Sequence, residues 1–318
     1  MSSRAIVRVQ GRDVRVGNTT NWRGLVATFV SSQDVKQSSR DLYNRTLSQF
    51  FKWVEETGRQ LSQMSRVDIL EYKDHLTQEG LSALTIGSYI VSVRKFYEWA
   101  ESEKLYPNIA KGIKTPRRIQ AFKKQHLTDG KSEELLSYFE EKSLRDFAIV
   151  NLILRTGLRT IEVVRADIGD ITFKGERRIL KIWGKGHTEK SDFVVLSDKA
   201  YLPIANYLAT RKGAKAGEPL FVSNSRQNRG ERLTTRTISH LCKEGLQAVG
   251  LDGKEFTAHS LRHTTAVAVL KQTDFNIYKA QLVMRHSSPT TTQIYVESIK
   301  GEEARLEQAP ELVVDNAF

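Results

Sequence analysis

The chain has a single cysteine, Cys242, among 318 residues. One thiol cannot form an internal disulfide, and it excludes any zinc site that needs several cysteines. No apolar run approaches the roughly 20 residues of a membrane span. The N-terminus is polar and rich in arginine and has no apolar segment of the signal-peptide kind. We therefore expect an intracellular, soluble protein with no membrane partner, cytoplasmic in location and nucleoid-associated if the source is prokaryotic.

Several signatures of enzyme chemistry are also missing. No GxSxG motif is present, which argues against a serine hydrolase of that type. The stretch GKGHTEKS lacks the spacing of a phosphate-binding GxxxxGK[ST] loop. His259 and His263 have the spacing of a zinc pair, but no HExxH glutamate or cysteine ligand accompanies them. RNP-like and KH-like signatures of an RNA-binding module are absent as well.

Acidic residues are outnumbered, with 37 Asp and Glu against 49 Lys and Arg, for a net charge of +12. Such an excess indicates a polyanionic partner, most often nucleic acid, although a merely solvated basic surface is the alternative. Residues 111–125 hold basic side chains and no acid: Lys111, Lys114, Arg117, Arg118, Lys123 and Lys124. The segment after Gly301 is mainly acidic. We predict that the basic segment contacts DNA and that the acidic tail does not.

The apolar pattern is helical from about Ser31. Residues 38–58, 65–80 and 82–103 each repeat apolar side chains at helical spacing, and the second begins with a Ser-x-x-Asp capping signal at Ser65. Further on, residues 131–142 and 144–157 predict helices, and 170–175, 177–186 and 191–197 predict three short strands in a meander or hairpin pair. Helices then resume to about Tyr295. The fold class expected is mainly α with a small β-sheet.

Pro107 and Pro116 bracket a stretch where the helical pattern lapses, which indicates a domain boundary. We therefore expect a weakly ordered basic arm at 1–20, a helical DNA-binding domain at 21–110 and a basic linker at 111–125. A mixed α/β catalytic domain at 126–300 and an acidic tail at 301–318 complete the predicted organisation.

Four stretches of the second half carry reactive side chains. TGLRTIEV places Arg159 at the start of a helix with Glu162 one turn on, and WGKGHTEK places Lys185 on a glycine-flanked turn between strands. HSLRH puts His259 and Arg262 on one helix face. MRHSSPTTTQIY supplies His286 and Tyr295. Each stretch alone is better explained as ordinary structure, for example a surface ion pair or a hairpin turn.

Taken in order, these stretches resemble one family. The series R, K, HxxR, H and Y, carried by TGLR, GKG, HSLRHT and a histidine nine residues before a tyrosine, is similar to the tyrosine recombinases of the phage-integrase and Xer type. The resemblance covers about residues 20–300. It implies an N-terminal helical core-binding domain, a tyrosine-recombinase catalytic domain and site-specific cleavage and rejoining of DNA.

The resemblance implies that Tyr295 attacks the phosphodiester and forms a 3′-phosphotyrosyl bond, which preserves the bond energy without a cofactor. Arg159 and Arg262 would hold the scissile phosphate with planar forked donors, and His286 would add a further donor. With this much protein-borne positive charge, no metal ion is implied.

Lys185 would give a proton to the leaving 5′ oxygen. His259 would accept the tyrosine proton or orient the phosphate, and Glu162 would fix Arg159. One position departs from the family pattern, which usually has glycine before the second histidine, whereas this chain has Arg285. We expect Arg285 either to be an exposed substitution or to contact a phosphate, and the departure leaves the local backbone geometry open.

Strand exchange joins two duplexes with two cleavage sites each, so a homotetramer on double-stranded DNA is expected. The biological role of such a recombinase could be integration, excision, dimer resolution or inversion. Two alternatives stay open: a type IB topoisomerase-like enzyme that relaxes DNA without exchanging partners, and a DNA-binding regulator that has the fold without the chemistry.

Overall fold

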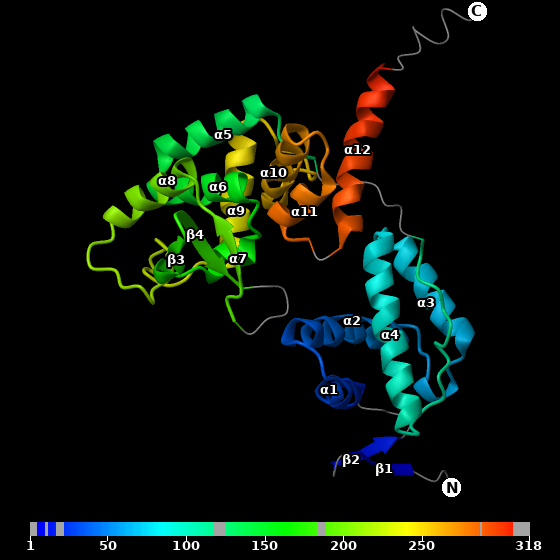
Figure 1. The fold of residues 1–318 in the computed structure, drawn as a ribbon. Helices are drawn as coiled ribbons and strands as arrows, with labels where there is room; N and C mark the ends of the chain where they lie inside the picture. Colours follow the sequence, from blue (N-terminus) through cyan, green and yellow to red (C-terminus); the bar gives the residue numbers. More distant parts are fainter. Residues whose placement is uncertain are drawn as a thin grey trace, which may run out of the picture. The chain divides into compact units, whose positions relative to one another are not determined.

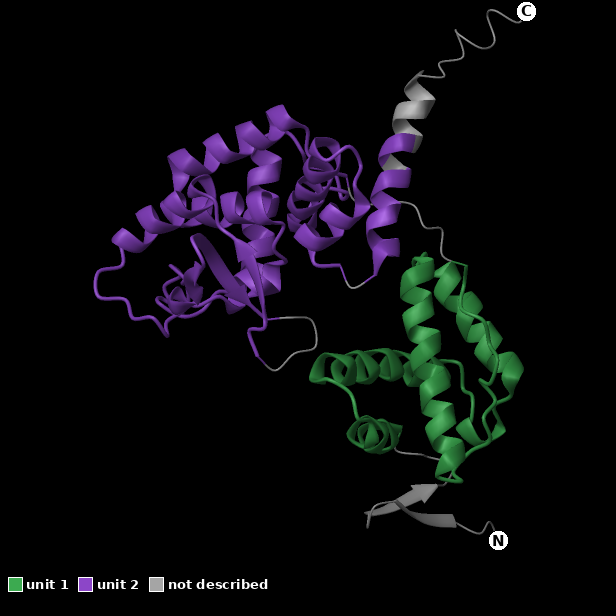
Figure 2. Cartoon of the chain, in the orientation of Figure 1, with its two compact units in different colours: residues 1–119 green, residues 120–318 purple. Residues whose placement is uncertain are grey.

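The computed structural model describes residues 5–9, 12–16, 22–117, 125–183, 189–286 and 288–307. The chain divides into two compact units, residues 1–119 and residues 120–318 (Figure 2). Arg118, Lys123, Lys124 and Lys185 lie outside the described residues.

Unit 1 is a bundle of helices preceded by a two-stranded antiparallel hairpin (Figure 1). The hairpin lies in the segment where the sequence shows no clear period, and its strands are β1 (Ala5–Val9) and β2 (Arg12–Val16). The helices of the bundle are α1 (Trp22–Ser32), α2 (Gln37–Glu56), the 3₁₀ turn η1 (Leu61–Gln63), α3 (Arg66–Gln78) and α4 (Ala83–Ser102).

Local signals in the sequence set these helix ends. Ser65 caps α3, with its hydroxyl accepting from the backbone of Val67 at 3.2 Å while the Asp68 carboxylate accepts from the Ser65 backbone at 2.7 Å. This reciprocal pair satisfies backbone donors that a helix start leaves unpaired. The capping signal expected at Ser65 is confirmed. Unit 1 is held by an aromatic core in which Phe50, Phe51 and Phe96 are almost fully buried.

Unit 2 has a helical core with a small three-stranded sheet (Figure 1). The first helices are α5 (Asp129–Lys142), α6 (Leu144–Thr156), α7 (Thr160–Arg165) and the 3₁₀ turn η2 (Ile168–Asp170). The strands β3 (Ile171–Lys174), β4 (Arg177–Ile182) and β5 (Asp192–Val195) pair antiparallel in that order. The predicted meander is therefore confirmed.

The later helices of unit 2 are α8 (Asp198–Ala209), α9 (Thr235–Ala248), α10 (Ala258–Gln272), α11 (Ile277–Met284) and α12 (Pro289–Glu307). Helix α12 continues beyond Tyr295, where the sequence pattern suggested that the helices end, so the first residues of the expected acidic tail are helical. Proline suits the first position of a helix because its missing N–H has no partner there. Tyr295 thus lies on a helix rather than at the end of a loop.

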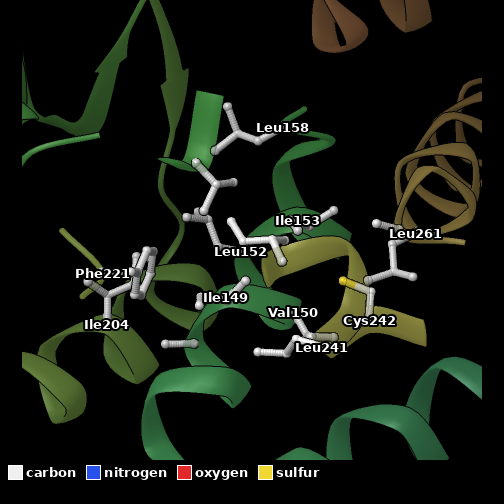
Figure 3. Close-up of a cluster of buried hydrophobic side chains, with 14 of the residues drawn as sticks. Ile149, Val150, Leu152, Ile153, Leu158, Ile204, Phe221, Leu241, Cys242 and Leu261 are labelled. Atoms are coloured by element: carbon white, nitrogen blue, oxygen red, sulfur yellow. The ribbon is translucent and has the colours of Figure 1, made fainter. Parts of the chain in front are cut away.

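Helix α6 is the centre of the unit 2 core. Six consecutive residues, 148–153, are buried on it, and side chains from α8, α9 and α10 pack around them. Figure 3 shows this cluster, with Cys242 of α9 buried among Val150, Leu241 and Leu261. Burial raises the pKa of the Cys242 thiol to about 12, so the thiol is a packing group.

Candidate active site

Arg159 and Glu162 are joined at the first turn of α7. One oxygen of the Glu162 carboxylate accepts from the backbone N–H of Arg159 at 2.8 Å, and the other accepts from the Arg159 guanidinium at 2.8 Å. Glu162 is buried, whereas the Arg159 side chain is 32% exposed. A buried carboxylate therefore fixes both the backbone and the guanidinium of an arginine whose surface is partly open.

Arg262 connects the ends of two helices. It is 2% exposed, and its two terminal nitrogens donate to the carbonyl oxygens of Gly157, which ends α6, and Met284, which ends α11. Gly157 has φ +61°, and a Cβ there would lie 2.9 Å from the Met284 sulfur. Glycine is therefore required twice, for the left-handed turn and for the close approach.

The positive charges of Arg159, Arg262 and Arg285 lie close together in this cluster. Burial, together with Arg159 and Arg285, lowers the pKa of Arg262 from 12.5 to about 9, although Glu162 opposes the shift. The guanidinium is still protonated at neutral pH. A guanidinium has five N–H donors, so the two carbonyl bonds leave capacity for an anion. The arrangement is suited to binding a phosphate, which would relieve the repulsion.

Tyr295 lies in the second turn of α12 and is 4% exposed, packed with Ala266, Met284 and Ile299. Helix α12 lies against α10 and α11 (Figure 1). Burial raises the pKa of the Tyr295 hydroxyl to about 12, while the nearby charges of Arg262 and Arg159 act in the lowering direction. The tyrosine and both arginines therefore belong to one electrostatic cluster within a single chain.

The hydroxyl of Tyr295 is hydrogen-bonded to Nδ1 of His263. His263 is buried, and burial, followed by His259 and Arg262, lowers its pKa to about 3. The imidazole is therefore neutral at pH 7, and with its proton on Nε2 its Nδ1 accepts from the tyrosine. The sequence indicates for His263 only the spacing of a zinc pair with His259. The useful signal was its position one residue after Arg262, on the helix face that His259 shares.

The remaining histidines lie around this contact. The His259 ring is 4.6 Å from the ring of His263, and His259 is exposed. The His286 ring stacks 6.0 Å from the Tyr295 ring, and its Nδ1 lies 2.9 Å from the hydroxyl of buried Thr292. Burial, then Arg262 and Arg159, lowers the pKa of His286 to about 4. Both His263 and His286 are thus held neutral beside positive charge.

Arg285 ends α11 with a left-handed backbone, φ +51° and ψ 48°. Its side chain is 9% exposed and pairs with the Glu162 carboxylate at 3.0 Å. One of the two expectations from the sequence, that Arg285 is an exposed substitution, is therefore wrong. The backbone question left open by the sequence is answered, because the arginine adopts the conformation that glycine favours.

The structure brings Arg159, Glu162, His259, Arg262, His286 and Tyr295 into one region of unit 2. Lys185 falls between β4 and β5, in the gap at 184–188 of the described residues. Lys111, Lys114 and Arg117 are exposed and belong to unit 1.

Two absences can be stated for the described part of the chain. It contains no group of three or more His, Cys, Asp or Glu side chains arranged to hold a metal ion. Its helices also include none long and apolar enough to cross a membrane.

Comparison with known proteins decides the family. Residues 125–302 match the phage integrase family, and residues 27–104 match the phage integrase N-terminal SAM-like domain. The chain belongs to the phage integrase family. It is a tyrosine-type site-specific recombinase, which confirms the resemblance of the ordered motifs and the expected fold class.

Relatives of this integrase-family chain include the tyrosine recombinase XerC of Caldanaerobacter subterraneus, 30% identical over 65% of this chain and 57% of the relative. That match spans little more than half of the relative. The tyrosine recombinase XerD of Vibrio cholerae is 24% identical over 86% of this chain and 91% of the relative. Among solved structures, a XerH site-specific recombinase bound to a palindromic difH substrate in a post-cleavage complex has a TM-score of 0.70 at 20% identity, covering 90% of this chain and 83% of that one. The structural likeness supports the fold.

Proposed function

We propose that this chain cleaves and rejoins double-stranded DNA at specific sites, with Tyr295 as the nucleophile that becomes attached to the 3′ phosphate. The observation that carries the proposal is the hydroxyl of Tyr295, which is buried within the same cluster as two arginines. Each subunit therefore supplies its own nucleophile. The SAM-like N-terminal match and the DNA-bound recombinase of like fold support duplex DNA as the partner.

The proposed phosphate clamp consists of Arg159, Arg262 and His286. Arg262 is held by two carbonyls and Arg159 by one carboxylate, so neither has to reorganise when a phosphate arrives. Preorganised donors stabilise the charge that grows on the non-bridging oxygens during attack. His286, neutral and fixed through Thr292, contributes a further ring N–H.

The proton balance assigns separate roles to the remaining groups. As the Tyr295 oxygen forms its bond to phosphorus, His263 accepts the hydroxyl proton through the hydrogen bond that already joins them. The bond from phosphorus to the 5′ oxygen breaks, and Lys185 supplies the proton that this oxygen needs. Exposed His259 orients the phosphate. The reverse steps rejoin the strand, and the scheme routes no step through a cofactor or metal ion.

The central test is Tyr295→Phe, which removes only the attacking oxygen. Purified protein should be incubated with duplex fragments that flank its gene, and covalent adducts should be trapped, sequenced at the attachment point and counted. The variant should bind the fragments normally and form no adduct. Tyr278→Phe is the matched control, because Tyr278 is 68% exposed on α11 and should be silent. An adduct formed by Tyr295→Phe would mean that the nucleophile is another residue.

Lys185 as general acid has a test of its own. Lys185→Ala should slow cleavage of ordinary DNA. A substrate whose leaving group is a 5′ thiol should restore the rate, because a thiolate leaves without a proton. If the sulfur substrate gives the variant no advantage over ordinary DNA, the proton comes from elsewhere.

We further propose that four subunits act together on two duplexes, with residues 1–20 as a basic arm, 21–110 and 126–300 as DNA-binding and catalytic domains, and 111–125 as a linker that contacts DNA.

The segment 301–318 would dock on a neighbouring subunit. Deleting residues 308–318 leaves α12 whole. It should spare binding to one site but impair cooperative assembly and recombination. Recombination of two sites at the full rate by the shortened chain would make residues 308–318 dispensable.

Integration, excision, dimer resolution and inversion all use this chemistry, and the trapped attachment point identifies the DNA sequence that is cleaved. A two-site assay separates recombination from topoisomerase-like relaxation. A DNA-binding regulator without chemistry is disfavoured, because six of the seven side chains given roles in this scheme, all except Lys185, are gathered in the described part of unit 2.

A further inference from the structure

Arg285 occupies a backbone conformation that glycine adopts freely and that other residues avoid. The family usually has glycine here. The turn at 284–286 exposes carbonyl oxygens that both clamp arginines use: Arg262 donates to Met284, and Arg159 donates to Arg285 at 3.4 Å. The left-handed turn therefore helps to hold the side chains of Arg159 and Arg262 in place. Because this backbone conformation is unfavourable for an arginine, a stabilising interaction of its side chain has to compensate for the cost.

The compensating interaction points inward. One terminal nitrogen of Arg285 donates to Glu162 Oε2 at 3.0 Å and lies 3.4 Å from the Gly157 carbonyl oxygen. The other donates to the Val283 carbonyl at 2.8 Å. With its side chain 9% exposed, the guanidinium is directed into the unit rather than to its surface. A long basic side chain held in this way is poorly placed to follow a DNA backbone.

Glu162 is the residue that Arg285 holds in place and keeps ionised. Its Oε2 accepts from both the Arg159 backbone and Arg285, while Oε1 holds the Arg159 guanidinium. Burial alone would raise the pKa of Glu162, but the charge of Arg285, followed by Arg159, outweighs it and holds the pKa below its usual value. Arg262 is the other charged group that faces this carboxylate. Without Arg285, the carboxylate would lose the largest of the charges that keep it ionised.

We infer that Arg285 is a positioning residue: it anchors Glu162 from behind and thereby fixes Arg159 for the scissile phosphate, without contacting the phosphate itself. The inference rests on the proposed function and adds to it a closed chain of contacts. The side chain of Arg285 holds Glu162, Glu162 holds Arg159, and Arg159 donates back to the carbonyl of Arg285.

The test compares Arg285→Gly, Arg285→Lys and Glu162→Gln by the rate of covalent adduct formation on the flanking duplex fragment to which the unaltered chain attaches. Glycine suits the turn, so Arg285→Gly should remain folded, as a melting curve will verify. Its cleavage rate should fall by roughly tenfold or more, in the range of measured couplings between neighbouring groups. Lysine should restore part of the rate. Lys279→Ala, at an exposed position of the same helix, is the control.

Two readouts distinguish this role from a phosphate contact or a purely structural one. In Arg285→Gly the acid limb of the pH–rate profile should move to higher pH, because Glu162 protonates more easily. In a Glu162→Gln background the Arg285→Gly change should cost little more. DNA affinity and its salt dependence should stay unchanged.

Full additivity with Glu162→Gln, an unmoved profile, or a salt slope reduced by about one would overturn the inference, and the last would indicate a direct phosphate contact. An unchanged cleavage rate in Arg285→Gly would also overturn it. Failure of the unaltered chain to form any adduct would instead count against the proposed function, so the two failures are distinguishable.

Discussion

Nδ1 of His263 is hydrogen-bonded to the hydroxyl of Tyr295, with the two rings 5.0 Å apart inside unit 2. The two residues are 32 positions apart, on α10 and α12. Arg262 is the neighbour of His263 on α10. One turn of one helix thus carries both the partner of the tyrosine and an arginine of the proposed phosphate clamp, so a shift of α10 would move both together.

Replacing His263 should separate hydrogen bonding from packing. His263→Phe fills the space but cannot accept a proton, and adduct formation should slow by about 10²-fold, the lower end of what a positioned base contributes. His263→Gln has a carbonyl that can accept a hydrogen bond and should retain more of the rate. His240→Phe, at an exposed position of α9, is the control. Equal rates for the phenylalanine and glutamine variants would show that packing alone matters.

Acid should destabilise unit 2 before its carboxylates titrate. In the folded chain the pKa values of His263 and His286 are about 3 and about 4, against 6.5 for a free histidine. Above pH 6.5 both are neutral in either state, and their stabilising contribution is complete. Below it the unfolded chain binds protons that the folded chain does not bind, so stability falls with pH, down to about pH 4 for His286 and about pH 3 for His263. For buried His263 the slope is about 1.4 kcal/mol per pH unit at most.

Thermal melts between pH 7.5 and 4.5 measure this effect. The His263→Phe variant should show a shallower loss with falling pH, because it has one fewer such group. A slope identical to that of the unaltered chain would show that His263 protonates as easily in the folded state as in the unfolded one.

Gly157→Ala should be harmful for a local reason. The residue has φ +61°, and its new Cβ would lie 2.9 Å from the Met284 sulfur, so the turn must move and take the carbonyl that Arg262 uses with it. We expect a loss of about 1–2 kcal/mol of stability from the backbone conformation alone, and slower cleavage. Gly130→Ala is the matched control, since a Cβ there meets nothing within 4 Å. Equal melting temperatures and cleavage rates for both variants would contradict this account.

The basic segment can be tested through salt dependence. Lys111, Lys114 and Arg117 are exposed, and neutralising all three to glutamine should reduce the slope of log affinity against log salt by about 0.9 for each phosphate that the variant no longer neutralises. The control neutralises Lys131 and Lys142, which are already paired with Glu134 and Glu244. If the slope is the same for the triple variant and the unaltered chain, these side chains face solvent, and the excess charge acts only on solubility.

Much of the fold was accessible from local signals. Gly157 closes α6 in a left-handed turn, and Ser65 with Asp68 starts α3, both as their residue types predicted. The three strands follow runs of β-branched residues between glycine and polar turns. The extent of α12 was not accessible, because the alternation of acids with apolar residues after Gly301 suits a helix as well as a solvated tail. The hairpin β1–β2 was missed because its alternating stretches, Val7-Arg8-Val9 and Val14-Arg15-Val16, are only three residues long.

The family residues were accessible as an ordered series, but the contacts between them were not. Nothing local indicates that Tyr295 meets His263 rather than His259, since both histidines share a helix face and only the packing of α12 on α10 selects one. The direction of the Arg285 side chain likewise depends on Glu162, which is 123 residues earlier in the chain. Such pairings are properties of tertiary structure.

Three guanidiniums, those of Arg159, Arg262 and Arg285, surround the single carboxylate of Glu162. This excess of positive charge opposes folding, and an anion that binds among the guanidiniums stabilises the native state by mass action. Heat resistance and substrate occupancy are thereby linked. The recombinase released from its DNA is the form that unfolds more easily. Any multivalent anion that reaches the site, sulfate included, should protect it from unfolding, and the protection should increase with the anion's similarity to a phosphodiester.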